Sequence, residues 1–233
     1  VGRVRKAYDA YEFHAVVRTI LDFLVTDLSA FYLDITKDRL YCGRPDGVER
    51  RSAQTAVWRM LDGCLRLMAP VLSFTVEEAW GHFRRPAGAP DSVFLARLPE
   101  AADYPVDAPL AATMTAFLGV RDVVLKALEE ARAAKVIGHP LAAAVTVRVQ
   151  AGTDAERAVR AFESALPELF VVSRVRVDAV PALGADAPAV AEVAAIDGPR
   201  CARCWNYAES VGADARHDDL CARCADVLET LPA

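Results

Sequence analysis

Four cysteines lie in two closely spaced pairs near the C-terminal end of the sequence. Cys201 and Cys204 form the first pair, Cys221 and Cys224 form the second, and sixteen residues separate the pairs. This spacing falls within the pattern of zinc modules in which about 15 to 20 residues separate two C-x-x-C turns. Four thiolates would fill a tetrahedral shell and leave no position for water. We therefore predict one structural Zn²⁺ in a four-cysteine ribbon, in preference to a catalytic metal or two disulfides.

The remaining candidate ligands do not fit this pattern as well. His217 lies shortly before Cys221 and could replace one thiol, but four cysteines are already paired, so we interpret it as a solvated loop residue. Cys42 and Cys64 stand alone on apolar stretches. Unpaired cysteines of this kind are typical of buried packing positions in a reducing compartment. We therefore expect a cytoplasmic protein.

Length and composition indicate a globular chain, because 54% of its 233 residues are hydrophobic. It begins Val1-Gly2-Arg3 without an initiator methionine, so we expect the C-terminal portion of a longer protein. No signal peptide and no apolar run of transmembrane length is evident, and we expect a monomer with no membrane partner. The formal net charge is −5, yet residues 1–72 carry eleven Lys/Arg against nine Asp/Glu, a net of +2. Charge alone neither indicates nor excludes a nucleic-acid partner.

Hydrophobic periodicity predicts a mainly α fold. Apolar residues recur at steps of three and four over residues 11–40, 51–68 and 110–134, and a capping box opens a shorter helix over residues 75–83. Four helices with short and medium connections indicate an antiparallel helical bundle, which we assign to residues 1–137.

The period changes to two after the bundle. Residues 145–150 and 171–177 alternate as strands do, and a capped helix over residues 153–165 lies between them. Residues 179–188 are rich in Ala, Pro and Gly and are typical of a linker. We therefore predict a small α+β element with its linker over residues 138–195, followed by the zinc ribbon over residues 196–233.

Several segments in this order resemble the C-terminal part of bacterial isoleucyl-tRNA synthetases, a class I aminoacyl-tRNA synthetase family. The matching runs are residues 10–14 (AYEFH), 28–41 (LSAFYLDITKDRLY), 50–80, 135–138 (KVIG) and 201–205 (CARCW). The resemblance implies an anticodon-binding helical bundle, an appended α+β element and a zinc-binding tail that helps to hold the anticodon arm of tRNA(Ile). It also implies membership of isoleucine–tRNA ligase, which charges tRNA(Ile) with isoleucine using ATP.

The ATP-handling motifs of class I synthetases, His-Ile-Gly-His and Lys-Met-Ser-Lys-Ser, do not occur in this sequence. The resemblance therefore transfers no catalytic residue to this chain. Because both the catalytic and the editing domains are absent from it, we expect the chain to be inactive alone.

Candidate tRNA contacts are cations for phosphates and flat side chains for unstacked bases. Lys37 and Arg39 end the first predicted helix and could form a basic rim with the arginines at 50 and 51; the alternative is a solvated helix end. Trp205 follows a predicted zinc ligand and either packs over the metal site, which we slightly favour, or stacks on a base. Arg203 and Arg223 occupy equivalent places in the two C-x-x-C turns and either contact phosphate or offset thiolate charge.

Two other interpretations stay open at this point. The bundle resembles those of valine and leucine synthetases as well, and the four-cysteine tail is the feature that argues against them. A zinc-ribbon module that binds nucleic acid or protein, such as the tail of a DNA-repair glycosylase, would explain the cysteines but not the long helices.

Overall fold

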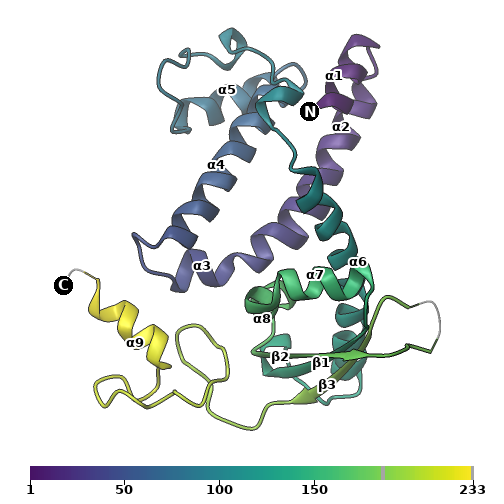
Figure 1. Ribbon diagram of the computed structural model, residues 1–233. Coiled ribbons are helices and arrows are strands. Elements are labelled where there is room, and N and C mark those ends of the chain that lie inside the picture. The colour runs from purple at the N-terminus through teal and green to yellow at the C-terminus, as the bar shows by residue number, and fades with distance from the viewer. Residues whose placement is uncertain (185–186, 232–233) are drawn as a thin grey trace. The chain divides into compact units, whose positions relative to one another are not determined.

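The computed structural model describes residues 1–184 and 187–231 (Figure 1). The described chain divides into two compact units. Unit 1 comprises Val1–Asp34 and Asp46–Val106, and unit 2 comprises Ile35–Pro45 and the described residues from Asp107 onward. The domain boundaries expected from the sequence, 1–137, 138–195 and 196–233, stay a prediction; residues 185, 186, 232 and 233 lie outside the described part.

Unit 1 is helical. Its elements are α1 (Gly2–Asp9), α2 (Phe13–Asp22), the π-helix η1 (Phe23–Leu33), α4 (Val48–Met68), α5 (Ser73–His82) and the short 3₁₀ turns η2 (Val93–Leu95) and η3 (Ala101–Asp103). One apolar cluster joins α1 and α2 to the end of α4 through Val4, Val16 and Leu67. The Tyr8 hydroxyl also donates to the Leu67 carbonyl oxygen at 2.6 Å. A second cluster packs Trp80 of α5 against α4 and η2.

The single long helix predicted over residues 11–40 is divided in the structure. The α-helix ends at Asp22, π-helical hydrogen bonding follows over Phe23–Leu33, and a separate helix, α3 (Lys37–Cys42), belongs to unit 2. Most residues of the π-helical segment are apolar, so spacing alone did not distinguish the two windings.

Unit 2 contains a three-stranded sheet with strand order β2-β1-β3. The central strand β1 (Ala143–Gln150) pairs parallel with β2 (Arg174–Val180) and antiparallel with β3 (Val190–Ala195). Between β1 and β2 the chain forms α7 (Asp154–Ala161), η5 (Glu163–Ala165) and α8 (Leu166–Phe170), and η4 (Pro140–Ala142) precedes β1. The alternation predicted for β1 is confirmed, because Val145, Val147 and Val149 are buried.

The structure differs from the prediction at two places in this region. Strand β2 begins at Arg174 rather than at residue 171, because the chain ends α8 with Val171 in a left-handed conformation (φ 57°). Strand β3 was not predicted at all, since its residues are mostly alanine and valine with weak alternation.

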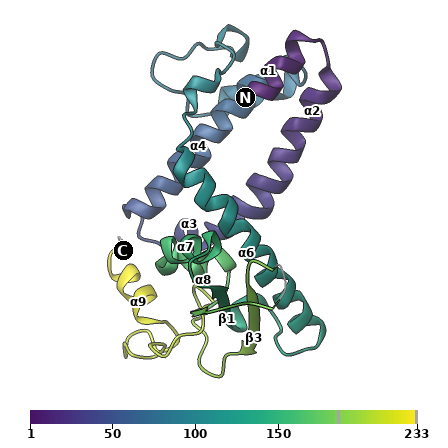
Figure 2. The same ribbon diagram turned by 45° about the vertical axis from the view of Figure 1, so that its right-hand side comes forward.

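Helix α6 (Ala108–Ala133) carries the core of unit 2 and lies beside α7 and β3 (Figure 2). Its 26 residues have the length and apolar composition of a membrane-spanning helix, so the expectation that no apolar run reaches that length is wrong. Phe117, Val120 and Val124 are nevertheless fully buried in the core that α6 forms with the sheet and α7. A packed face of this kind is typical of a core helix in a globular protein.

The C-terminal part of unit 2 has little regular structure apart from α9 (Ala222–Glu229). An isolated β-bridge joins Arg200 to Tyr207 and closes a small hairpin around the first cysteine pair. The mainly α fold class, followed by a small α+β element and a C-terminal ribbon-like segment, is confirmed.

Candidate metal centre and its surroundings

The four paired cysteines converge on one point. The sulfur atoms of Cys201, Cys204, Cys221 and Cys224 all lie within 4.8 Å of one another, and all four residues are buried. Among the described residues, these four cysteines are the one group of three or more His, Cys, Asp or Glu side chains close enough together to hold a metal ion. The set fits Zn²⁺, because four soft sulfur donors at this separation match a closed tetrahedral site.

Local backbone hydrogen bonds shape each cysteine pair. In the first pair, the Trp205 N–H donates to the Cys201 carbonyl oxygen and the Cys201 N–H donates to the Asn206 carbonyl oxygen, both at 3.0 Å. In the second pair, Cys221 is the N-cap of α9 and Cys224 lies in its first turn. Each turn is therefore shaped in part by its own backbone.

The thiols differ in how readily they ionise. Burial opposes ionisation of Cys201, but backbone N–H groups of Cys204, Cys221 and Arg203 donate to its sulfur and lower the pKa of this thiol to about 6. Burial raises the pKa of Cys224 well above its ordinary value, despite a hydrogen bond from Arg203. Four thiolates cannot accumulate in so small a space without a compensating cation. A bound Zn²⁺ would supply that charge.

His217 does not approach this cluster as a ligand. Its Nε2 atom lies 3.4 Å from a carboxylate oxygen of Glu229. The interpretation of His217 as a loop residue outside the metal site agrees with this position.

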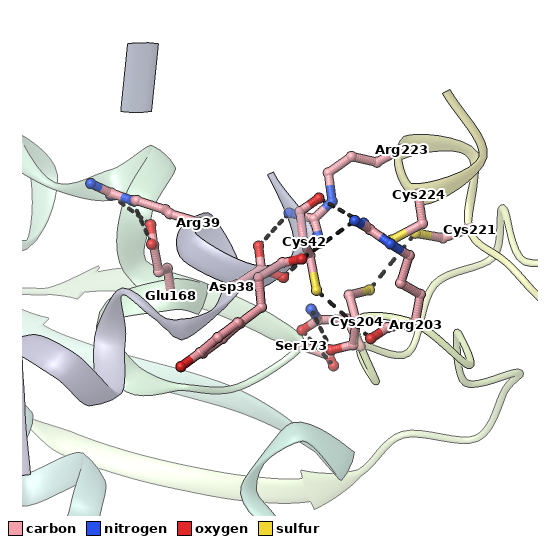
Figure 3. A network of polar contacts seen from close by, with 12 residues as sticks. Asp38, Arg39, Cys42, Glu168, Ser173, Arg203, Cys204, Cys221, Arg223 and Cys224 are labelled. Carbon is pink, nitrogen blue, oxygen red and sulfur yellow. Dashed lines mark hydrogen bonds and ion pairs between the residues drawn. The ribbon is translucent and has the colours of Figure 1, made fainter. Parts of the chain in front are cut away.

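Helix α3 lies against the cysteine cluster, as Figure 3 shows. Arg203 of the first turn donates to the carbonyl oxygens of Cys42 at 2.7 Å and Tyr41 at 3.4 Å. The same guanidinium lies 3.7 Å from the Cys224 sulfur. In the second turn, Arg223 pairs with both carboxylate oxygens of Asp38, one of them at 2.8 Å. The two arginines that occupy equivalent places in the C-x-x-C turns thus both contact α3.

Cys42 completes the contact between α3 and the cluster. It is buried in one apolar cluster with the four paired cysteines and Leu220, and its thiol lies 3.7 Å from the Arg203 carbonyl oxygen. Burial raises the pKa of the Cys42 thiol. The packing role predicted for this residue agrees with that environment. Sequence reasoning missed its partner, because nothing in the spacing links residue 42 to residues beyond 200.

The basic residues predicted at α3 have different environments. Arg39 pairs with Glu168 of α8, with its Nε atom 2.5 Å from one carboxylate oxygen. Lys37 opens α3 and is exposed. Arg50 and Arg51 lie in the first turn of α4 and belong to unit 1. Arg39 therefore holds two elements of unit 2 together, whereas the Lys37 side chain reaches the surface.

Trp205 is unusual in backbone and in exposure. Its φ of 65° lies in the left-handed region, which bulky residues rarely adopt. Its side chain is 59% exposed, so the packing interpretation that we slightly favoured from the sequence is not supported. Tyr207, two residues later, lies with its ring centroid 6.1 Å from that of His139. The hairpin therefore exposes the flat side chain of Trp205 to solvent beside the cysteine cluster.

Comparisons with known proteins connect this geometry to a family. Residues 1–147 match the family described as the anticodon-binding domain of tRNA ligase. The chain belongs to this family. Residues 198–227 also match the zinc finger found in FPG and IleRS, a segment that contains all four clustered cysteines. The resemblance seen in the sequence is confirmed.

Three curated relatives of this chain are each named isoleucine–tRNA ligase. The chain is 43% identical over 99% of its length to the isoleucine–tRNA ligase of Carboxydothermus hydrogenoformans and covers 25% of that protein. It is 44% identical over 97% of its length to the isoleucine–tRNA ligase of Syntrophotalea carbinolica, again covering 25%. The protein of the same name from Geobacter sulfurreducens is 41% identical over 97% of this chain. The chain thus spans about a quarter of the length of the relatives that it matches.

Proposed function

We propose that this chain is the tRNA-recognition part of an isoleucine–tRNA ligase and binds the anticodon arm of tRNA(Ile). The observation that carries the proposal is the presence, in one chain, of matches to the anticodon-binding domain of tRNA ligase and to the zinc finger found in FPG and IleRS. The relatives' printed name supports isoleucine as the amino acid. Activation of isoleucine with ATP and its transfer to tRNA would require residues outside this sequence, which lacks both ATP-handling motifs.

We further propose that Cys201, Cys204, Cys221 and Cys224 hold one Zn²⁺ with a structural role. All four sulfurs are buried and together they would complete a tetrahedral shell. When bound, the ion would supply charge compensation and folding free energy to a segment with little apolar core of its own. The chain's own residues would then carry every contact with RNA.

Within this function, Trp205 is the proposed base-stacking residue. Single-stranded RNA bases stack on exposed aromatic rings, and such stacking is tolerant of sequence. Trp205 is more than half exposed, and its backbone has a left-handed conformation that bulky residues rarely adopt. Strained backbone conformations cluster at functional sites, so a bulky residue kept in one suggests a role in function rather than in stability.

Lys37 is the proposed phosphate contact at α3, because it is exposed in the first turn of that helix. Arg39, Arg203 and Arg223 stay proposed tRNA contacts as well, but each already donates to a group of unit 2. They would have to share those donors with phosphate.

We also propose that the protein acts as a cytoplasmic monomer without a membrane partner.

The test is the salt dependence of binding to an RNA hairpin with the sequence of the tRNA(Ile) anticodon arm. Loss of one phosphate contact should flatten the slope of log K against log salt by about one. Lys37→Ala should show this change. Lys126→Ala is the matched control, because Lys126 is an exposed lysine of α6 in the same unit, 4.0 Å from Glu130. Equal slopes for wild type and Lys37→Ala would remove Lys37 from the interface.

A further inference from the structure

Helix α3 is short, and six residues do not form a stable helix by themselves in water. Its conformation must therefore come from its surroundings. The last carbonyl groups of any helix lack intrahelical donors. In α3, Arg203 supplies donors to two of these, the carbonyl oxygens of Tyr41 and Cys42. The C-terminal end of α3 is thus capped by a side chain from the first C-x-x-C turn.

The second C-x-x-C turn holds the other end of the same helix. Asp38 lies in the first turn of α3 and pairs with Arg223 through both carboxylate oxygens. A third link joins Arg44, just after α3, to Asp226 of α9 at 2.6 Å. The second cysteine turn therefore holds the N-terminal end of α3 through Arg223, and the first turn holds the C-terminal end through Arg203, as Figure 3 shows.

The metal site and α3 also share buried material. The Arg203 guanidinium lies between the α3 carbonyls and the Cys224 sulfur, and Cys42 is buried with the four sulfurs. Each arginine lies within its C-x-x-C turn, so a change in the geometry of either turn would move that arginine away from α3. Because small zinc modules fold with their metal, the caps of α3 should form only when both turns are closed.

We infer that Arg203 and Arg223 are positioning residues that clamp α3 to the zinc-binding segment, so that metal binding orders α3 and the side chains that it presents. The two equivalent arginines of the two turns act on opposite ends of one helix. This inference rests on the proposed Zn²⁺ site, and its consequence, that zinc controls the placement of Lys37 at the RNA surface, rests on the proposed tRNA binding. The clamp itself is a property of the folded chain.

The test is hydrogen exchange of the α3 amides, residues 40–42, in the full zinc-loaded chain. Arg223→Gln should accelerate exchange by about threefold to fivefold, since partly exposed ion pairs are weak. Arg203→Gln should accelerate it by about tenfold, because the carbonyl oxygens of Tyr41 and Cys42 both lose a charged donor. Removal of zinc with a chelator should accelerate it at least as much as either substitution.

Arg216→Gln is the matched control. Arg216 is an arginine of the same segment, but its carboxylate partners, Asp214 and Glu229, lie in the segment itself. This variant should leave α3 exchange unchanged. The double variant Asp38→Arg with Arg223→Asp reverses the ion pair and leaves Arg203 in place. It should restore protection relative to Arg223→Asp alone.

Zinc content and RNA affinity, measured on the same variants, separate the two proposals. Unchanged α3 exchange in Arg203→Gln and Arg223→Gln, or no rescue by the reversed pair, would overturn the clamp whatever the RNA result. Faster α3 exchange with full zinc and unaltered affinity for the anticodon-arm hairpin would support the clamp and count against α3 as part of the RNA surface.

Discussion

Replacement of Trp205 by alanine separates a base-stacking residue from a packing residue. Loss of an aromatic stacking surface costs about 1 to 3 kcal/mol per base, which is a decrease in RNA affinity of roughly 5- to 150-fold. Trp205→Phe should retain most of the affinity because it keeps a flat ring. The assay is titration of zinc-loaded protein with the tRNA(Ile) anticodon-arm hairpin at low salt, well below the unfolding temperature.

The same substitution has a bounded effect on stability. Since the side chain is 59% exposed, about two fifths of its surface, or about 100 Å² of a tryptophan's roughly 250 Å², is buried. At about 25 cal/mol per Å² this gives an upper limit of ~2.5 kcal/mol. Trp205→Gly should lose less stability than Trp205→Ala, because glycine adopts the left-handed backbone without strain. Unchanged RNA affinity in both variants, with lowered stability of the zinc-binding segment, would refute base stacking.

Three further outcomes follow from the structure. Cys221→Ser should release zinc and expose mainly the segment after residue 198, whereas Cys64→Ser, which lies in α4 outside the cluster, should keep its metal; atomic absorption and limited proteolysis measure both. The chain should show no isoleucine-dependent ATP–pyrophosphate exchange, and a clear signal from pure protein would mean that a nucleotide site was overlooked. Backbone N–H donation from Glu100 and hydrogen bonds from the Arg97 side chain lower the pKa of the Asp103 carboxyl below 3.8. The stability that the ionised carboxylate contributes is therefore complete above that pH and is lost as the pH falls through the lowered pKa. In acid titrations, Asp103→Asn should lose stability less steeply over this range than the wild type.

The features that were predicted from the sequence are those encoded by local spacing. Two C-x-x-C turns place four sulfurs at one point because each turn is closed by its own backbone, as the Trp205 N–H shows. Strand β1 was predicted because its valines alternate and one face is buried. Helices α4 and α6 carry apolar stripes long enough to be recognised by period alone.

The features that were missed depend on partners distant in sequence. Strand β3 exists because β1 offers it an edge to pair with, and its own residues carry little strand signal. The clamp on α3 joins Asp38 to Arg223 across 185 positions. Arg39 was proposed as an RNA contact from its charge at a helix end, and Arg203 from its charge and its place in a C-x-x-C turn. Their partners inside unit 2, Glu168 and the α3 carbonyl oxygens, lie far away in sequence.

The most direct test of the central claim is an anticodon exchange in an otherwise unchanged tRNA. Zinc-loaded protein is titrated with tRNA(Ile) and with the same tRNA carrying a foreign anticodon, at several salt concentrations. The account predicts that the exchange weakens binding by about tenfold or more at every salt concentration, because base contacts confer selectivity while phosphate contacts set the salt slope. Equal affinities for the two tRNAs would contradict anticodon recognition by this chain.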